Sequence, residues 1–306
     1  MGGRVEMKIG EMNRENEMIY SGHNACPGCG AALAVRFLTR ALGDNLAIAL
    51  TASCWSIIAG APPLTALKCP VLHCPFPSAG SVGSGLKRGL NAKGLYDTTV
   101  VVLAGDGGTF DIGLQALSGA AQRNEDFIFV CYDNEAYMNT GMQTSSATPF
   151  GARTNTAPYP LFKAGQKKDI MQIMAAHSIP YAATATVAFP EDLDMKLKKA
   201  KQVRGFRFIH ILSPCPPGWG TESADTIELS RLAVSSGSFP LYEVTDGSDW
   251  RMTYPLEEKR TPLKDYLGMQ KRFKEIDRHR LQVLQEEVDR EWDYLIEKAN
   301  RSESKK

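Results

Sequence analysis

The hydrophobic residues of this chain gather in short continuous runs, which are clearest near its middle. Thr98–Ala104 is an apolar, largely β-branched run, and Phe127–Tyr132 is a second one. Continuous runs of this length are typical of strands buried on both faces of a parallel sheet. Between them, Ile112–Arg123 has the spacing of a helix. This strand–helix–strand unit, with a right-handed crossover, predicts an α/β fold.

The pattern continues on both sides of this unit. We expect further strands over Leu46–Thr51 and Phe206–Leu212, and helices over Ala31–Leu42 and Ile170–His177. Residues 60–85 are rich in glycine, proline and serine, and they predict a long irregular segment.

The last part of the chain has a helical pattern of its own. From about Met269 to Asn300 the sequence predicts a long charged helix. Its apolar stripe, which could cover the body or a neighbouring subunit, consists of Phe273, Ile276, Leu281, Leu284, Val288, Trp292 and Leu295. We expect an N-terminal arm over 1–20, an α/β domain over 21–240 and a C-terminal extension over 241–306.

Composition excludes several classes of protein. Lysine and arginine number 35 against 34 aspartates and glutamates, so there is no overall basic field for nucleic acid. No apolar run approaches the roughly 20 residues that span a bilayer, and the first residues lack the pattern of a signal peptide. We expect a cytoplasmic protein.

Polar residues follow two of the predicted strands at the points where they end. Gly105-Asp106-Gly107 follows the first, and Asn134 follows the second, 28 positions after Asp106. The carboxyl ends of parallel strands share one edge, where ligands bind. Carboxylate and amide oxygens suit Mg²⁺, which commonly bridges to phosphates, and glycines allow close backbone approach. Gly-Asp-Gly alone occurs in many ordinary turns; the strand context and Asn134 are what favour a magnesium and diphosphate site.

Four of the seven cysteines have positions that suggest a shared role: Cys26, Cys29, Cys54 and Cys215. In a reducing compartment they favour metal ligation over a disulfide framework. The Cys-x-x-Cys pair fits a redox disulfide, half a zinc site or half an iron–sulfur site. No evident strand precedes it, and no second close pair of zinc ligands accompanies it. The residues favour a cluster and leave zinc open. The remaining cysteines are Cys69, Cys74 and Cys131.

Taken together, the motifs resemble those of a known family. From about residue 20 to 275 the chain is similar to the β subunit of a 2-oxoacid:ferredoxin oxidoreductase of the pyruvate synthase type. The segments that carry this resemblance are His23–Cys29, Ser53-Cys54, Gly105–Gly113, Asp133–Gln143, Ser213–Pro216 and Tyr266–Phe273.

The resemblance implies a fold and a set of site residues. The fold is the thiamine-diphosphate-binding type, a mostly parallel doubly wound sheet with helices on both faces. Mg²⁺ is bound by the side chains of Asp106 and Asn134 and the carbonyl of Ala136. The residues implied to contact thiamine diphosphate are Cys54, Gly105, Asp106, Gly107, Asn134 and Asn139. One [4Fe-4S] cluster is bound by Cys26, Cys29, Cys54 and Cys215. Asn139 and Thr140 lie beside the substrate carbon as catalytic residues.

The resemblance also implies an activity and partners. The reaction is oxidative decarboxylation of a 2-oxoacid, with pyruvate favoured, to acyl-coenzyme A and carbon dioxide, or the reverse, with ferredoxin as the electron partner. In this family the α subunit supplies the cofactor-activating glutamate and substrate contacts. Other subunits supply ferredoxin-like clusters and the coenzyme A site. We therefore expect the chain to be inactive alone.

Other functions stay open at this point. Within the family, the substrate could be a branched-chain 2-oxoacid, an aryl glyoxylate or oxalate. A non-oxidative thiamine decarboxylase or carboligase would keep Asp106 and Asn134 without needing the four cysteines. A zinc-stabilised scaffold subunit would need the cysteines and not the Asp106–Asn134 pair.

Overall fold

The structure is a computed structural model that describes residues 17–254 and 260–304. Within them the strands form one eight-stranded sheet in the order β2-β1-β3-β4-β6-β5-β7-β8. The first six are parallel, and β7 and β8 pair antiparallel at one edge. The predicted mostly parallel α/β fold is confirmed. The strands are β1 (Leu46–Thr51), β2 (Val71–Cys74), β3 (Thr99–Gly105), β4 (Ile128–Asp133), β5 (Tyr181–Thr186), β6 (Arg207–Leu212), β7 (Tyr242–Thr245) and β8 (Asp249–Met252).

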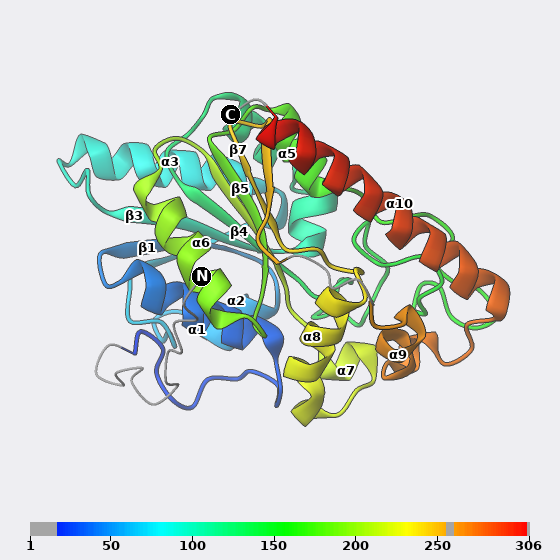
Figure 1. The fold of residues 1–306 in the computed structure, drawn as a ribbon. Coiled ribbons are helices and arrows are strands. Elements are labelled where there is room, and N and C mark those ends of the chain that lie inside the picture. The colour runs from blue at the N-terminus through cyan, green and yellow to red at the C-terminus, as the bar shows by residue number, and fades with distance from the viewer. Residues whose placement is uncertain (1–16, 255–259, 305–306) are drawn as a thin grey trace.

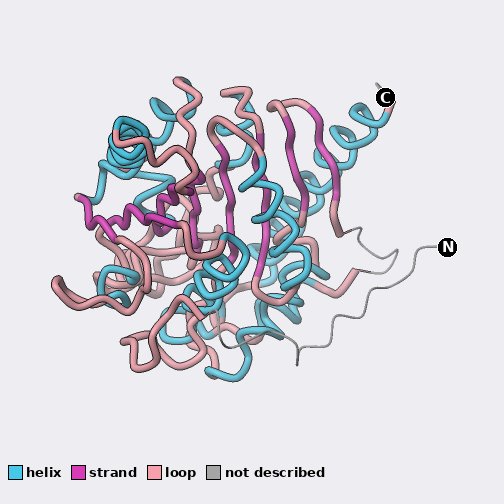
Figure 2. Tube along the Cα trace, turned by 90° about the vertical axis from the view of Figure 1, so that its left-hand side faces the viewer, coloured by secondary structure: helices cyan, strands magenta, loops and turns pink. Residues whose placement is uncertain are grey.

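Helices cover both faces of the sheet, and the tube in Figure 2 shows helical segments to either side of the strands. They are α1 (Gly30–Leu42), α2 (Cys54–Ala59), α3 (Ala79–Ala92), α4 (Leu114–Gln122), α5 (Ile170–Ala176), α6 (Pro190–Gln202), α7 (Pro216–Trp219), α8 (Thr226–Ser235), α9 (Leu263–Gly268) and α10 (Arg278–Glu303). Short turns of other helical types are η3 (Phe76–Ser78), η4 (Gly107–Asp111), η5 (Ser223–Asp225) and η6 (Lys271–Phe273).

Strand β3 shows why the sheet needs both layers. Its side chains alternate between the two faces. Val101 and Leu103 pack in a core with α1 and α6, whereas Val100 and Val102 pack in another with α3 and α4. A strand buried on both faces has no polar positions, which explains the continuous apolar run in the sequence.

The prediction of an irregular segment over residues 60–85 is wrong, because this segment contains β2 and the first half of α3. Two of its glycines, Gly80 and Gly83, lie at close packing contacts. A Cβ at Gly80 would lie 2.2 Å from the carbonyl oxygen of Ala116 on α4. The high glycine content predicted a loop, whereas Gly80 is needed because α3 and α4 touch at this position.

The C-terminal helix is shorter than predicted at its start. α10 begins at Arg278, where the Asp277 side chain caps it by accepting a hydrogen bond from the Arg280 backbone at 2.8 Å. Phe273 lies before it, in η6. Four positions of the expected stripe are buried against the same chain: Leu284, Val288, Trp292 and Leu295. Figure 1 shows α10 running from the side of α9 towards α5 and β7.

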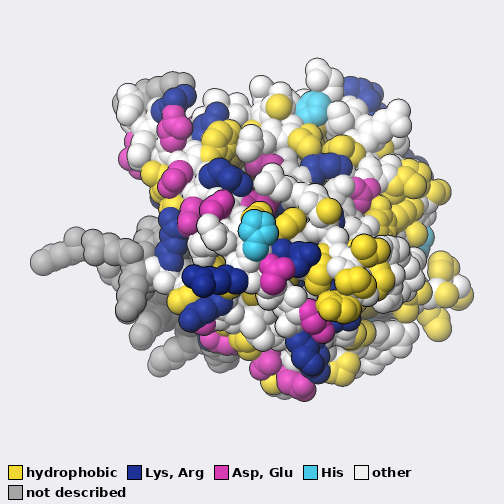
Figure 3. All heavy atoms as spheres, turned by 90° about the vertical axis from the view of Figure 1, so that its right-hand side faces the viewer, with side chains coloured by type: hydrophobic (Ala, Val, Ile, Leu, Met, Phe, Trp, Pro, Cys, Tyr) yellow, Lys and Arg dark blue, Asp and Glu magenta, His cyan; other side chains and the backbone are white. Residues whose placement is uncertain are grey.

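The structure describes part of the expected N-terminal arm and most of the expected C-terminal extension. The 241–306 segment contributes β7 and β8 to the common sheet as well as α10. Most of the expected arm, residues 1–16, lies outside the described residues; after it, Ile19 forms an antiparallel bridge with Leu67. None of the described helices is both long enough and apolar enough to cross a membrane. Basic and acidic side chains intermingle on the face in Figure 3, as the balanced composition suggests.

The strand order locates the place where a ligand can enter the sheet edge. From β1 the chain turns to β2 on one side, and β3 then lies on the other side of β1. Such a reversal opens a crevice beyond the carboxyl ends of the two strands. The loops after β1 and β3 therefore diverge at the β1/β3 boundary, and they carry Cys54 and Asp106.

The close contact at Gly80 can be tested by substitution. Gly80→Ala should lower the free energy of unfolding by about 1–3 kcal/mol, because the added methyl group overpacks the α3–α4 contact. Urea denaturation measures the change. Gly85→Ala in the same helix is the control, since a Cβ there meets nothing within 4 Å. It should be neutral or stabilising by up to about 1 kcal/mol; equal losses in both variants would contradict this explanation.

Candidate functional site

A cavity of 390 Å³ lies at the β1/β3 boundary, beyond the carboxyl ends of the strands. It is lined by the segments that follow β1, β3 and β4, and by Phe76 after β2. The predicted site residues that line it are Cys54, Gly105, Asp106, Gly107, Asn134, Ala136, Asn139 and Thr140. The structure therefore brings together residues that are up to 86 positions apart, counted from 54 to 140.

Three oxygen atoms converge in this cavity. The side-chain oxygen of Asn134 lies 3.0 Å from Oδ1 of Asp106 and 2.8 Å from the carbonyl oxygen of Ala136. All three are acceptors, so none of them satisfies another. If the amide were turned over, its NH₂ would donate to both neighbours. In the present orientation, a cation among the oxygens would resolve their repulsion.

Asp106 is held deep in the protein, with 1% of its surface exposed. Its Oδ2 accepts a hydrogen bond from the Ser145 hydroxyl at 2.5 Å, which leaves Oδ1 facing Asn134. Burial and then the nearby Asp133 carboxylate raise the pKa of Asp106 well above its usual range. A cation beside Oδ1 would oppose both effects by favouring the ionised form.

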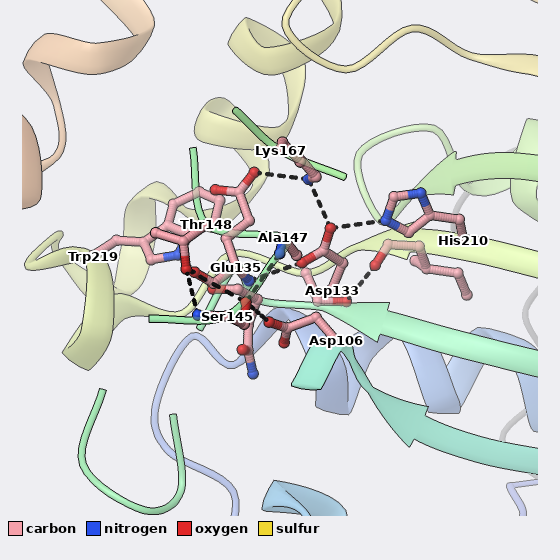
Figure 4. A network of polar contacts seen from close by, with 12 residues as sticks. Asp106, Asp133, Glu135, Ser145, Ala147, Thr148, Lys167, His210 and Trp219 are labelled. Carbon is pink, nitrogen blue, oxygen red and sulfur yellow. Dashed lines mark hydrogen bonds and ion pairs between the residues drawn. The ribbon is translucent and has the colours of Figure 1, made fainter. Parts of the chain in front are cut away.

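The loop after β4 is fixed by buried charges, which Figure 4 shows at close range. Oδ2 of Asp133 lies 2.8 Å from Nζ of Lys167 and 2.8 Å from Nε2 of His210. Its Oδ1 accepts the Glu135 backbone N–H at 2.8 Å. Burial alone would raise the pKa of Asp133, but Lys167 and His210 hold that pKa below its usual range. Asp133 is thus an ionised anchor directly before Asn134.

Glu135, which follows Asn134 in the sequence, also fixes the position of this loop. Its φ of +63° places it in the left-handed region, an uncommon conformation for this residue type. Its carboxylate pairs with Lys167 at 3.2 Å and with Arg272. The hydroxyl of Thr148 donates to its carbonyl at 2.7 Å. These contacts hold the strained turn that points Asn134 and Ala136 into the cavity.

The Cys26–Cys29 turn is packed against the segment that carries Cys215. The Gly30 backbone N–H donates to the Pro214 carbonyl at 3.1 Å, and a Cβ at Gly30 would lie 2.8 Å from the Pro214 nitrogen. The Thr226 hydroxyl donates to the Gly28 carbonyl at 2.5 Å. These contacts hold two segments distant in sequence together.

The four predicted cluster cysteines interact electrostatically. Burial, and after it Cys215, Cys29, Asp106 and Cys26, raise the pKa of Cys54 to about 12. Burial is also the main cause that raises the pKa of Cys215 to about 11, although the Gly218 backbone opposes the rise. Cys54 also begins α2 and lines the cavity. Cys54 thus shares the cavity lining with Asp106, Asn134 and Ala136.

The four cysteines predicted to bind a cluster do not form a ready-made metal site in this structure. Among the described residues, these cysteines included, no group of three or more His, Cys, Asp or Glu side chains is arranged to hold a metal ion. The convergence of Asp106, Asn134 and Ala136 does not count as such a group, because an amide oxygen and a backbone carbonyl oxygen are not among these side chains. The remaining three cysteines, Cys69, Cys74 and Cys131, are buried.

Asn139 and Thr140, the predicted catalytic residues, lie exposed at the rim of the cavity. The Thr140 hydroxyl donates to Oε1 of Gln143 at 2.6 Å. Gly107 has a packing role, since a Cβ there would lie 2.2 Å from the Tyr137 ring. A Cβ at Gly105 would make only ordinary contact with Tyr132.

Several residues that shape the site were not predicted from their own positions. Ser145 and Lys167 lie in irregular segments with no motif around them, so nothing in the sequence singles them out. Phe76 and Ile57 also line the cavity. Phe76 lies in the 60–85 segment that was predicted to be irregular, and Ile57 lies just before that segment. Arg272 belongs to the late Tyr266–Phe273 segment of the resemblance, which gave it no stated role.

Comparison with known proteins agrees with this geometry. The family model described as thiamine pyrophosphate enzyme, C-terminal TPP binding domain, matches residues 55–211. Pyruvate synthase subunit PorB of Methanothermobacter thermautotrophicus is 47% identical over 279 residues, covering 90% of this chain and 96% of the relative. Ketoisovalerate oxidoreductase subunit VorB of Pyrococcus horikoshii is 44% identical over 288 residues, covering 91% and 92%.

A solved structure shares the fold at lower identity. The 2-oxoglutarate:ferredoxin oxidoreductase from Magnetococcus marinus, solved with 2-oxoglutarate, coenzyme A and succinyl-CoA bound, aligns with a TM-score of 0.60 and 22% identity. The alignment covers 90% of this chain and 97% of that one. At this identity the likeness shows the fold alone.

The Asp133 anchor yields a prediction about stability and pH. Asp133→Asn should lower the free energy of unfolding at pH 7 by about 3–5 kcal/mol, since it breaks a buried ion pair. Because the folded pKa lies below the ordinary value of 3.8, this stabilisation is present above that value. It is lost as the pH falls through the folded pKa. The difference in free energy of unfolding between wild type and variant should therefore become smaller below about pH 4.

Urea denaturation over a series of pH values measures this difference. Asp293→Asn, at an exposed carboxylate on α10, is the control and should change little. A difference for Asp133→Asn that stays constant down to acid pH would show that Asp133 does not act as an ionised anchor.

Proposed function

Because this chain belongs to the thiamine-dependent 2-oxoacid:ferredoxin oxidoreductase subunits that include PorB and VorB, we propose that it binds Mg²⁺, thiamine diphosphate and one [4Fe-4S] cluster. The resemblance noted in the sequence is confirmed at the level of the family. The reaction we propose is oxidative decarboxylation of a 2-oxoacid to acyl-coenzyme A and carbon dioxide, with electrons passed to ferredoxin, or its reverse.

The convergence of three oxygens is the observation that carries this proposal. Mg²⁺ has octahedral geometry with ligand distances of about 2.0–2.1 Å, so neighbouring ligand oxygens lie about 2.9 Å apart. The separations of 3.0 Å and 2.8 Å around the Asn134 oxygen match that value. Asp106, Asn134 and the Ala136 carbonyl are therefore the proposed Mg²⁺ ligands. The positions that remain suit diphosphate oxygens and water.

The cluster is proposed on Cys26, Cys29, Cys54 and Cys215. The Cys26–Cys29 turn packs on the Pro214 segment next to Cys215, and Cys54 begins α2 at the cavity wall. Thiolates are the usual ligands of a [4Fe-4S] cluster. The position of Cys54 in the cavity lining would put the cluster next to the cofactor.

The bound groups would supply the decarboxylation and electron-accepting chemistry, and this chain would supply placement. The loop after β4 would hold two of the proposed metal ligands, Asn134 and Ala136. Asn139 and Thr140 are proposed to face the reacting carbon of the substrate, where the Asn139 amide can donate to an oxygen that gains negative charge. Gly105 and Gly107 border the diphosphate side of the cavity.

The proposed substrate is pyruvate, with a branched-chain 2-oxoacid as the second candidate. Relatives named pyruvate synthase and ketoisovalerate oxidoreductase are 47% and 44% identical to this chain, which supports small or branched acids. Aryl glyoxylate and oxalate are the further alternatives within the family. Coenzyme A is proposed as the acyl acceptor.

Partner subunits are proposed to complete the site. Among the described residues that line the cavity, Asp106 is the only acid, and it already faces the metal position. The cofactor-activating glutamate and the groups that contact the substrate are therefore assigned to an α subunit. The exposed Asn139 and Thr140 mark the rim that this subunit would cover. Ferredoxin-like clusters and the coenzyme A site are assigned to other subunits, and the chain alone should be inactive.

The first test is metal and cofactor content. The protein is purified without oxygen together with its co-purifying subunits, and iron, sulfide, zinc, magnesium and thiamine diphosphate are measured. Asp106→Ala should weaken binding of thiamine diphosphate at least about 100-fold, since a direct ligand should matter no less than an outer one. Asp97→Ala, at an exposed position, is the control. Zinc without thiamine diphosphate would support the scaffold alternative, and thiamine diphosphate without iron would support a non-oxidative enzyme.

The second test assigns the cluster to this chain. Cys54→Ala should remove the iron and sulfide attributed to the four thiols, with loss of the matching electron paramagnetic resonance signal. Cys69→Ala is the control, because Cys69 is a buried cysteine outside the proposed ligand set. Unchanged iron in Cys54→Ala would rule out the proposed ligand set.

A further inference from the structure

A second cavity, of 400 Å³, lies apart from the one at the β1/β3 boundary. Its walls are the end of α7, the turn η6 with the residues that follow it, and residues 153–158. Met142 also lines it, whereas Thr140, two positions earlier, lines the first cavity. One turn of the chain thus separates the two cavities. The lining of the second cavity contains no residue proposed above to bind Mg²⁺, thiamine diphosphate or a cluster.

The lining of the second cavity carries an excess of positive charge. Glu275 is its only acid, and its basic side chains are Arg153, Lys271, Arg272 and Lys274. Arg272 pairs with Glu135, and Arg153 pairs with Glu275. Neither Lys271 nor Lys274 has an ion pair within the part of the chain that the structure describes. A cavity that keeps uncompensated charge of one sign attracts ligands of the opposite sign.

The aliphatic part of Lys271 is held against one wall of this cavity. A Cβ at Gly220 would lie 2.7 Å from Cβ of Lys271 and 3.2 Å from its Cγ and Cδ. Gly220 ends α7 with a φ of +66°, and its lack of a side chain lets the lysine pack there. Because the lysine is placed before a ligand arrives, binding costs less conformational entropy.

Arg153 has a donor that the described chain does not use. Its Nη1 pairs with Glu275, and its backbone N–H donates to the Arg272 carbonyl at 2.9 Å. Its Nε is buried and has no hydrogen-bond partner among the described residues. Buried donors in proteins are normally paired, so this one indicates an acceptor from outside the chain. An oxygen of a bound anion would supply it.

The remaining walls suit a ligand larger than a simple ion. Met142, Pro158 and Pro217 give the lining an apolar part. The Asn155 backbone N–H donates to the Met142 carbonyl at 2.9 Å, which ties two of the walls together. The cavity volume falls in the range of about 300–1,000 Å³ that is usual for ligand sites. There is room for an anionic group and a small organic part.

We propose that the second cavity binds a phosphate group, either free or carried by a small organic molecule, through Lys271, Lys274 and Nε of Arg153. Ammonium and guanidinium groups are the usual side-chain partners of phosphate. Three separate donors match the three terminal oxygens of a phosphate group, whereas a carboxylate has only two. The inference goes beyond the proposed function and stands without it, because no metal, thiamine diphosphate or cluster takes part.

Binding is measured on the full chain by isothermal titration calorimetry, with inorganic phosphate, ADP and adenosine as probes. A chelator keeps divalent metal out, so that the proposed Mg²⁺-dependent cavity does not contribute. Phosphate and ADP should bind and compete with each other, and adenosine should not bind. Both affinities should fall as salt is added. Tighter binding of ADP would identify a phosphorylated organic molecule as the ligand, and equal affinities would identify free phosphate.

Substitutions assign the binding to this cavity. Lys271→Gln and Lys274→Gln should each weaken phosphate binding about tenfold, since each removes one charged donor. Arg153→Lys keeps the charge but removes Nε, and it should have a similar effect. Glu275→Gln removes the only acid of the lining, so phosphate should bind about threefold more tightly. Lys93→Gln, at an exposed lysine that ends α3, is the matched control and should bind as wild type.

Three results would overturn the inference: no binding of phosphate or ADP to the wild-type chain, wild-type affinity in both lysine variants, or an equal loss in Lys93→Gln. If circular dichroism shows that a lysine variant does not fold, Glu275→Gln decides the question. A loss of side-chain packing alone would not tighten binding, so unchanged or weaker binding in Glu275→Gln would contradict an anion site. Iron and thiamine diphosphate contents test only the proposed function, and either proposal can fail without the other.

Discussion

The arrangement of the site depends on one buried carboxylate, that of Asp133. Removing such a charge from water costs several kcal/mol unless partners compensate for it. Here Lys167 and His210 meet one oxygen, and the Glu135 backbone meets the other. The buried carboxylate is stable only while these partners contact it. The chain that leaves β4 is therefore held in one conformation. Asn134 and Ala136 face the cavity as a consequence of that conformation.

Sheet topology brings the other groups to the same place. The reversal at β1 and β3 opens one crevice, and the loops that border it carry Cys54 and Asp106. Cys54 and Asp106, which come from different loops, therefore both line one cavity. Their shared placement follows from strand order and not from any local motif.

The sequence could predict the parts of this structure that leave a local signal. β1, β3, β4 and β6 were visible as continuous apolar runs, and the residues at their ends were visible as candidate ligands. Gly80 shows the limit, since glycine that permits close helix packing has the same composition signal as glycine in a loop. Lys167 and Ser145 could not be foreseen, because their role comes from position in space. Arg272 was visible only through resemblance, and its contacts explain why that late segment belongs with the site.

The electrostatics of the proposed site couple its two halves. Burial is the largest of the causes that raise the pKa values of Cys54 and Cys215, to about 12 and about 11, so both thiols would have to lose their protons to bind a metal. Thiolates bound to iron as proposed would lie near the Asp106 carboxylate, which also contributes to the raised pKa of Cys54. A Mg²⁺ ion bound as proposed beside Asp106 would offset that negative charge. Metal loading in either half of the site would thus lower the electrostatic cost of loading the other.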